Sequence, residues 1–394
     1  MMFFEYLVWG AWYVTLGTYM GKTLRFSGTE IGLVYGTTAL AAMISPFFVG
    51  MVADRFFATE KLLAALHLFG ALLLALLSTI GSFPLFYTVL LIYTLCYMPT
   101  LALTNSLSFH HMKDPGSEFP RVRVFGTIAW IVIGLILGKL KVEDSAFQLW
   151  LAAGGSAVMG LYALTLPHTP PKGAGQKVTW RQMLGLEALE LLRDRSFSIF
   201  IIGSFAICIP LSFYFAFANL FFNEIGIEQA AGKMTMGQVM EILVTLVMPF
   251  FLARLGIKKM MLTAMAAWTI RYLLFAAGNG QDSIWMLYFG ILLQGICYAF
   301  VFVAGQIFVD RQARPEIRAA AQGLITFVTF GAGMLVGSWL SGWVAQVYTR
   351  GELANLTHNW PAIWMVPALI SAGVFLLFAL FFKPSRETDY ASPQ

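Results

Sequence analysis

Residues 234–253 read MTMGQVMEILVTLVMPFFLA, a run of twenty residues in which Glu241 is the single charged side chain. A helix of about 20 apolar residues crosses the roughly 30 Å hydrocarbon core of a bilayer. A charged side chain at the centre of such a helix costs about 2.5–3.5 kcal/mol on insertion scales. Chains keep such a residue where it faces a protein interior or a water-filled path, so Glu241 is a candidate substrate or proton site.

The composition indicates that the whole chain is a membrane protein. It is 59% hydrophobic and 11% charged, whereas soluble domains carry about 25% charged residues. This excludes an ordinary soluble fold and favours a polytopic membrane protein. Cys96, Cys208 and Cys297 lie in apolar segments, so we expect packing residues and no disulfide or metal site. The first apolar run has no small-residue cleavage site after it, and we expect no cleaved signal peptide.

Twelve apolar segments are predicted to span the membrane, which makes the fold class all-α integral membrane. The fifth segment is short, and we expect it to begin near Pro120 and to take Arg123 into the membrane. The predicted limits are 3–20, 31–52, 62–80, 85–108, 124–137, 146–166, 197–222, 234–253, 260–277, 284–309, 319–347 and 361–382.

The longest polar stretch divides these segments into six and six. We predict an N-terminal six-helix half at 1–166, a cytoplasmic linker at 167–196, a C-terminal six-helix half at 197–383 and a cytoplasmic tail at 384–394. Within the linker, apolar residues between 180 and 192 have helical spacing, which predicts a helix on the membrane surface. A plain tether between the halves is the alternative.

Basic residues predict the orientation in the membrane. With the N-terminus in the cytoplasm, 18 of the 25 lysines and arginines fall in cytoplasmic loops or the tail and 6 in outer loops. This bias satisfies the positive-inside rule and places both termini in the cytoplasm. The net charge of +5 comes largely from these loops and does not indicate a nucleic-acid partner.

Two short patterns indicate a fold with two related halves. Pro120 and Arg123 open the fifth segment as P-x-x-R, and Pro315 and Arg318 open the eleventh in the same way. Two six-span halves related in parallel build the major facilitator fold. The segment Gly50-Met-Val-Ala-Asp54-Arg55 resembles the G-x-L-A-D-R signature of that superfamily.

The resemblance gives Asp54 and Arg55 a role in gating, and we assign Arg318 to gating or structure because it lies near the cytoplasmic end. Ordinary loop charges are the alternative for Asp54 and Arg55.

A closer resemblance, over nearly the whole chain, is to the nucleoside:proton symporter family of this superfamily. It implies proton-driven nucleoside uptake across a bacterial inner membrane. The motifs that carry it are Trp9-Gly-Ala-Trp12, Leu16-Gly-Thr-Tyr19, Tyr97-Met-Pro-Thr-Leu101, Asn105, Phe119-Pro, Arg123, Gly126-Thr127-Ile128, Gln238-x-x-Glu241, Pro249-Phe-Phe, Gly256-Ile-Lys, Trp268, Arg271, Ile317-Arg318-Ala and Ala321-Gln322-Gly323.

The fifth segment presents a cation, a hydroxyl and an aromatic ring on one helix face. Arg123, Thr127 and Trp130 stand at i, i+4 and i+7. Such a face suits a ligand with a ring and several oxygens, and the resemblance implies that these residues line a nucleoside pocket. Alternatively, Arg123 snorkels to the interface, Thr127 bonds its own backbone and Trp130 packs in the core.

Two later segments carry polar pairs with helical spacing. Gln238 and Glu241 stand at i and i+3, and Gln294 and Tyr298 at i and i+4. Glutamine offers a donor and an acceptor, and an ionised glutamate accepts hydroxyl bonds. The resemblance places all four in the pocket. A buried ion pair with an arginine is the alternative for Glu241, and packing is the alternative for Tyr298. Arg271 is expected to pair with a carboxylate or with backbone carbonyls.

The chain departs from the family pattern at three places. Ser212 and Phe215 stand where the familiar members carry a glutamine and an asparagine, and Ala299 replaces an aspartate. Ser212 and Phe215 are still predicted to contact the ligand. Tyr214 or Asn219 could replace the lost hydrogen bonds if the helix is rotated.

We therefore predict a transporter of nucleosides that works by alternating access, with Glu241 as the proton carrier and no cofactor or metal. Its partners are the nucleoside, protons and the bilayer, and it is expected to be a monomer. A sugar transporter of the same fold, a uniporter and a non-transporting receptor remain alternatives. An enzyme is not expected, because no paired acids, metal-ligand spacing or phosphate loop occurs.

Overall fold

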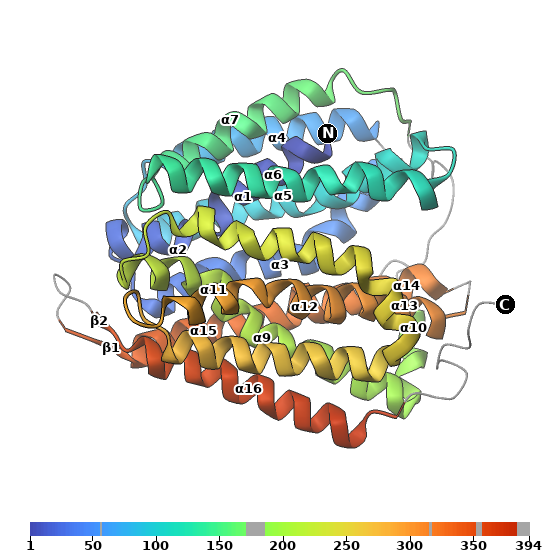
Figure 1. Ribbon diagram of the computed structural model, residues 1–394. Coiled ribbons are helices and arrows are strands. Elements are labelled where there is room, and N and C mark those ends of the chain that lie inside the picture. Colours follow the sequence, from blue (N-terminus) through green and yellow to red (C-terminus); the bar gives the residue numbers. More distant parts are fainter. Residues whose placement is uncertain (56, 171–185, 315–316, 352–356, 384–394) are drawn as a thin grey trace. The chain divides into compact units, whose positions relative to one another are not determined.

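The computed structural model describes residues 1–55, 57–170, 186–314, 317–351 and 357–383, and leaves out the side chains of residues 46–55, 115–117, 120, 186 and 319. The described chain is mostly helical, as predicted (Figure 1). The first elements are α1 (Met2–Tyr13), α2 (Leu16–Thr18), η1 (Tyr19–Leu24), α3 (Gly28–Arg55), α4 (Thr59–Leu77), α5 (Phe83–His111), α6 (Pro115–Leu140) and α7 (Phe147–Ala163).

The later elements begin after the residues that are not described. They are η2 (Leu186–Arg193), α9 (Arg195–Glu224), α10 (Ala230–Ala277), α11 (Ile284–Leu292), α12 (Gln294–Tyr298), η3 (Ala299–Val303), α13 (Ala304–Gln312), α14 (Arg318–Thr326), η5 (Phe327–Gly333), α15 (Met334–Val347), β1 (Thr349–Arg350), β2 (Thr357–His358) and α16 (Trp360–Phe381). The linker helix predicted at 180–192 lies partly outside the described residues, and its described part is the 3₁₀-helix η2.

Eight described helical stretches are long and apolar enough to cross a membrane. Each of the twelve predicted segments overlaps a helix, but the helices at the first, second and sixth segments, α1, α3 and α7, are not among these eight. The eight stretches that are long and apolar enough are Thr59–Leu77, Phe83–His111, Arg121–Leu140, Arg195–Glu224, Ala230–Ala277, Ile284–Gln312, Ala320–Val347 and Trp360–Phe381.

The helix α10 covers the eighth and ninth predicted segments together. Gly256 separates them with φ 65° and ψ 171°, a backbone conformation that glycine adopts without the steric cost that other residues meet. Two helices therefore meet at a sharp kink inside α10, where the sequence predicts a short loop.

The described residues between α15 and α16 include a short β-ribbon, in a chain that is otherwise mostly helical. Thr349 pairs with His358 and Arg350 with Thr357 in a two-stranded antiparallel ribbon. Threonine favours extended backbone, and Gly351 has φ 102°, which lets the chain turn after the first strand.

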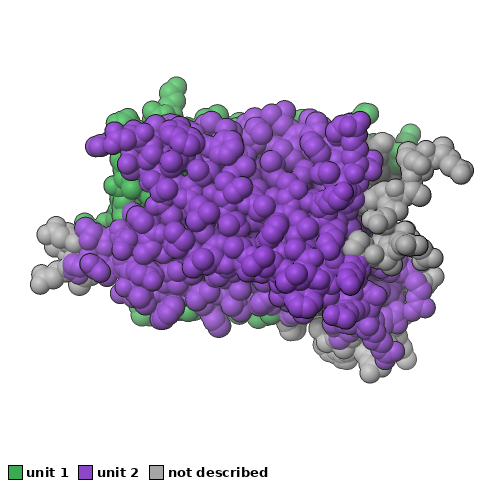
Figure 2. Space-filling model, turned by 60° about the horizontal axis from the view of Figure 1, so that its bottom comes forward, with its two compact units in different colours: residues 1–177, 215–235 green, residues 178–214, 236–394 purple. Residues whose placement is uncertain are grey.

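The chain forms two compact units, which Figure 2 colours separately. Unit 1 comprises Met1–Lys177 with Phe215–Thr235, and unit 2 comprises Val178–Tyr214 with Met236–Gln394. In unit 1, α1 packs against α6 and α7, α3 against α5, and α4 against α5 and α7. Residues 215–235, at the end of α9 and the start of α10, thus belong with the N-terminal helices.

Close backbone approach explains why residues 215–235 belong to unit 1. A Cβ atom on Gly17 would lie 2.2 Å from the carbonyl oxygen of Ala216, and one on Gly138 would lie 2.7 Å from the backbone nitrogen of Gly232. Small residues permit such helix contacts in membrane proteins, where packing replaces the hydrophobic effect.

A buried carboxylate anchors the same segment. Glu143, in the loop between α6 and α7, accepts hydrogen bonds from Asn219 Nδ2 at 2.9 Å, Asn223 Nδ2 at 2.7 Å and the backbone nitrogen of Ala231 at 2.9 Å. Asn219 Oδ1 in turn accepts from Thr18 Oγ1. The carboxylate thus ties α9 and α10 to the N-terminal helices of unit 1.

We expect Glu143→Ala to destabilise the protein by at least about 2 kcal/mol, because it removes the acceptor of three donors, of which Asn219 Nδ2 and the backbone nitrogen of Ala231 are buried. Glu228→Ala is the matched control, because Glu228 is exposed and, among the described residues, pairs with the exposed Lys141 at 3.3 Å. Its loss should change stability by less than about 0.5 kcal/mol. Thermal unfolding in detergent measures both, and equal midpoints for the two variants would contradict the anchoring role.

Candidate substrate-binding site

Two glycines bring the polar residues of α10 and α12 together in unit 2. A Cβ atom on Gly237 would lie 3.0 Å from Gln294 Cβ, and one on Gly295 would lie 2.5 Å from the carbonyl oxygen of Met240. The two helices therefore cross at the level where α10 carries Glu241. This crossing brings residues more than fifty positions apart in the sequence next to each other.

Arg271 is fully buried beside this crossing. Its Nη1 donates to Gln294 Oε1, and its guanidinium carbon lies 3.7 Å from the ring centroid of Tyr214. The partner is an amide and a set of aromatic faces, not the carboxylate or backbone carbonyl expected from the sequence. Among the described residues, Nε and Nη2 have no hydrogen-bond acceptor.

Gln238 on α10 has an unsatisfied hydrogen-bonding group at this point. Gln238 Oε1 is buried and accepts no hydrogen bond from the described residues. Glu241, one turn further, is half-buried and acts electrostatically on Tyr214. A buried acceptor without a donor costs about 1–3 kcal/mol, so a ligand hydroxyl or amine that donates to Gln238 would recover this free energy.

The other two predicted residues of unit 2 lie differently. Tyr298 is half-buried, with its ring 4.8 Å from that of Phe302. Ser212 is buried, and its hydroxyl lies 3.0 Å from the carbonyl oxygen of Cys208 and 3.2 Å from that of Met334. Ser212 therefore faces α15 and has its hydrogen bonds made within the helix packing.

Unit 1 gathers the predicted aromatic residues into one cluster. The ring of Trp130 lies 5.6 Å from Trp9 and 6.5 Å from Tyr13, and the ring of Phe215 lies 5.2 Å from Tyr13. Thr127 is half-buried on the same helix as Trp130. The cluster offers ring faces and edges of the kind on which a flat ligand stacks.

Arg123 lies one turn before Thr127. Its guanidinium carbon is 4.0 Å from the ring centroid of Tyr6, and a Cβ atom on Gly126 would lie 2.8 Å from Arg123 Nη1. The cation–π contact holds the guanidinium against α1, so the side chain is positioned by unit 1 itself.

The predicted gating residues are described only in part. Asp54 and Arg55 end α3, and their side chains lie outside the described part of the chain. Arg318 begins α14 and is half exposed, with Nε 4.0 Å from Asp310 Oδ2. An exposed pair at this distance contributes little to stability, which leaves Arg318 free to change partners.

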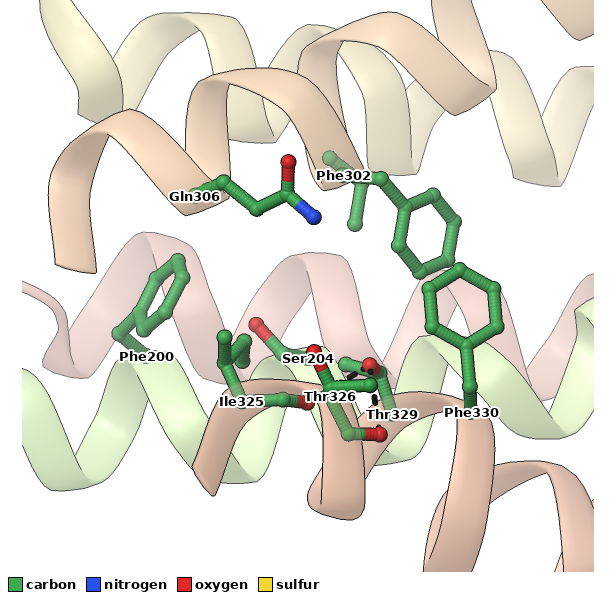
Figure 3. A pocket seen from close by; sticks show the side chains of 10 residues that line it. Phe200, Ser204, Phe302, Gln306, Ile325, Thr326, Thr329 and Phe330 are labelled. Carbon is green, nitrogen blue, oxygen red and sulfur yellow. Dashed lines mark hydrogen bonds between the residues drawn. The ribbon is translucent and has the colours of Figure 1, made fainter. Parts of the chain in front are cut away.

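A small pocket in unit 2 is lined by other residues (Figure 3), and it adjoins the predicted set through Phe302, whose ring lies 4.8 Å from that of Tyr298. Its wall combines phenyl rings with hydroxyl and amide groups, and Ser204 Oγ is buried there without a hydrogen-bond partner among the described residues. The residues that line it are Phe200, Ser204, Val301, Phe302, Gly305, Gln306, Ile325, Thr326, Thr329 and Phe330. The predicted site residues are not among them.

The sequence profile of the nucleoside H⁺ symporter family matches residues 1–387. The chain belongs to this family. It is 43% identical to the putative nucleoside transporter YegT of Escherichia coli over 98% of this chain and 93% of that protein. It is 32% identical to the xanthosine permease of the same organism over 99% and 96%.

A solved structure agrees with the family. A crystal structure of a mutant of the nucleoside transporter NupG matches with a TM-score of 0.91 and 32% identity, and covers 97% of this chain and 98% of that one. The chain therefore has a major facilitator-type transporter fold and is a membrane transporter, not an enzyme. This confirms the family and the fold type predicted from the sequence motifs.

Polar residues that the sequence patterns did not single out are also buried in unit 1. Glu5 and His67 lie within the first and third predicted segments and contact each other. The cost of an intramembrane charge, which pointed to Glu241, applies equally to Glu5. That signal is present in the sequence but weak, because Glu5 stands only two residues inside its predicted segment.

The crossing of α10 and α12 makes a testable prediction. We expect Gly295→Ala to lower nucleoside affinity by at least about 10-fold, because the added methyl meets the backbone of Met240 and forces about 1.4 kcal/mol or more of rearrangement at Glu241. Gly323→Ala is the matched control, because a Cβ atom there would meet nothing within 4 Å. Equilibrium binding to purified protein measures both, and normal binding by the Gly295 variant would contradict the tight crossing.

Proposed function

We propose that the protein imports nucleosides across a bacterial inner membrane together with protons. In this proposal the chain has twelve spans in two six-helix halves with cytoplasmic termini, functions as a monomer in the bilayer, and works by alternating access. Family membership supports the substrate class and the proton. The bias of basic residues supports the orientation.

The observation that carries the proposal is the polar cluster on α10 and α12. Gln238 Oε1 is a buried acceptor without a donor, and Arg271 orients the amide of Gln294 by binding its oxygen. Since that oxygen is engaged, the amide nitrogen of Gln294 is the group left to donate to a ligand. Together the two glutamines present an acceptor and a donor, the combination that a nucleobase edge requires.

Glu241 is proposed to bind both the ribose and the proton. An ionised carboxylate accepts hydrogen bonds from two hydroxyl groups, and a protonated one keeps a single donor. Protonation therefore changes how Glu241 engages the ribose, which links the two substrates. We propose that Tyr298 also contacts the nucleoside from unit 2, and that Arg123, Thr127, Trp130 and Phe215 contribute from unit 1.

Ser212 is the weakest member of the proposed set, because its hydroxyl faces α15. We keep it as a residue that positions α9, and we expect its hydroxyl to act on binding only through the helix. The gating proposal for Asp54, Arg55 and Arg318 rests on the resemblance of residues 50–55 to the superfamily signature.

A binding panel tests the substrate class. Purified protein in detergent is titrated with purine and pyrimidine nucleosides, with free nucleobases and with mono- and disaccharides, and thermal stabilisation and binding heat are recorded. We expect nucleosides alone to bind, because both the base edge and the ribose hydroxyls are engaged. Binding of sugars without nucleosides would replace the proposal by a sugar transporter of the same fold.

A further inference from the structure

Unit 1 buries a carboxylate and an imidazole in contact with each other. The exposed fractions of the Glu5 and His67 side chains are 0% and 1%, and Glu5 Oε2 lies 2.9 Å from His67 Nε2. Glu5 belongs to α1 and His67 to α4. Burying such a pair carries a desolvation cost that the pair's own attraction often does not outweigh, so it is not explained by stability alone.

The surrounding hydrogen bonds determine which nitrogen of His67 carries a proton. Ser156 Oγ donates to the carbonyl oxygen of His67 at 2.8 Å and lies 3.1 Å from His67 Nδ1. Because the hydroxyl has one proton and that proton is used, Ser156 Oγ accepts from Nδ1–H. Nε2 is then the nitrogen that can gain or lose a proton.

The contact with Glu5 therefore requires a proton between two heavy atoms. If Nε2 and Oε2 both presented lone pairs, they would repel each other at 2.9 Å. The geometry is therefore that of a protonated pair, in which one proton lies between His67 Nε2 and Glu5 Oε2. Without this proton, the lone pair of His67 Nε2 on α4 faces a lone pair of Glu5 Oε2 on α1.

The other carboxylate oxygen has room for a second proton. Thr100 Oγ1 lies 2.6 Å from Glu5 Oε1 and 2.5 Å from the carbonyl oxygen of Tyr97, and its single proton can serve only one of these acceptors. If Thr100 donates to Tyr97, then Oε1 approaches Oγ1 as a donor and carries a proton itself. The network thus accommodates two protonation states of Glu5 without moving a heavy atom.

The groups that act on Glu5 come from the helices packed around it. They are His67 on α4, Tyr6 on α1 itself, Tyr93 and Tyr97 on α5, and the amino group of Met1. His67 and the amino group of Met1 are the basic groups among them, and His67 is the one in contact with the Glu5 carboxylate. The tyrosines are acids far weaker than a carboxylic acid. Proton exchange is therefore centred on Glu5 and His67.

We propose that the Glu5–His67 pair is a second proton-binding site, separate from Glu241, and that its proton is taken up and released in each transport cycle. This rests on the proposed proton-coupled transport. In each cycle a proton from water loads Nε2 or the carboxylate, and the same proton returns to water when the pair opens. Within this site, Nε2 of His67 and the carboxylate of Glu5 are the atoms that change protonation.

Glu5→Gln tests the coupling, because the amide keeps the shape and both hydrogen bonds but cannot exchange a proton. Protons moved per nucleoside are counted in proteoliposomes from the membrane potential at which flux reverses. We expect this number to fall by one, with nucleoside affinity within about 3-fold of wild type. An unchanged number and an unchanged pH profile would overturn the proposal.

His168→Gln is the matched control, because His168 also contacts a carboxylate, Glu60, at 2.8 Å, but its side chain is 67% exposed. We expect it to change neither the proton number nor the pH profile.

A second measurement tests the pair without transport. The chain has five histidines, so ¹⁵N NMR of labelled protein, with His67→Gln for assignment, reports the protonation of His67 directly. We expect Nδ1 protonated throughout and Nε2 to change between acid and alkaline pH. A neutral, unchanging His67 would refute the site even if Glu5→Gln failed to fold. If wild type moved no protons with nucleosides while His67 changed protonation, proton-coupled transport and the cycling of this proton would both be refuted, and a proton-binding site alone would remain.

Discussion

Glu241→Gln is expected to abolish uphill nucleoside accumulation, while the variant still equilibrates nucleoside across the membrane. The substitution keeps the side chain's shape and removes its ability to carry a proton. It also replaces a charge-assisted acceptor, and hydrogen bonds to charged groups contribute about 1.5–3 kcal/mol, so affinity should fall by about 10- to 150-fold. Radiolabelled uptake into proteoliposomes with and without a proton gradient measures both effects.

Glu228→Gln is the control for Glu241→Gln, since Glu228 is exposed and lies in the sequence before α10 begins. It should accumulate nucleoside as wild type does. If Glu241→Gln still accumulates nucleoside against a gradient, Glu241 is not a proton carrier. If its affinity is also unchanged, Glu241 does not contact the ligand.

Arg271→Met is expected to lower nucleoside affinity by about 10- to 100-fold and to leave thermal stability unchanged or raised. Arg271 is a buried charge with two donor atoms lacking acceptors among the described residues, and replacing buried charges by apolar side chains of similar size is often neutral or stabilising. The loss in affinity follows because Gln294 no longer has a partner that fixes its amide.

Arg254→Met is the matched control for Arg271→Met. Arg254 also lies on α10 and also stacks on a ring, 4.3 Å from the centroid of Phe250, but it is exposed. Its loss should leave binding unchanged. The heat of nucleoside binding and the unfolding midpoint are measured for both variants, which separates an effect on the binding site from an effect on folding. A large fall in stability with normal binding for Arg271→Met would show that Arg271 stabilises the fold and does not position Gln294 for the ligand.

The sequence predicts the helices well because their signal is local. Hydropathy over twenty residues locates the spans, and the spacing of Gln238 and Glu241, or of Gln294 and Tyr298, follows from helical periodicity. The kink at Gly256 is less visible, because only its φ of 65° shows that the chain turns there while remaining otherwise helical.

The partners of the buried polar residues could not be predicted, because they depend on packing between distant segments. Arg271 meets Gln294 since Gly237 and Gly295 allow α10 and α12 to cross closely. Helical periodicity tells which residues share a face of one helix, but it does not tell which helices cross or where they touch. Ser212 shows the same limit, because its hydroxyl is engaged by α15 from the far end of the sequence.

The grouping of residues 215–235 with unit 1 is a further effect of distant contacts. The sequence divides the chain at its longest polar loop, whereas Glu143 binds three donors on α9 and α10. The three donors that Glu143 binds lie with it in unit 1, so this grouping depends on contacts between distant parts of the chain.

Nucleoside-driven proton entry is the measurement that tests proton-coupled nucleoside transport most directly. Proteoliposomes with a trapped pH dye and a clamped membrane potential receive external uridine or adenosine, and the internal pH is followed. We predict acidification that depends on the nucleoside, saturates with its concentration and disappears with a protonophore. Nucleoside uptake at the same rate without any acidification would show a uniporter and would contradict proton coupling.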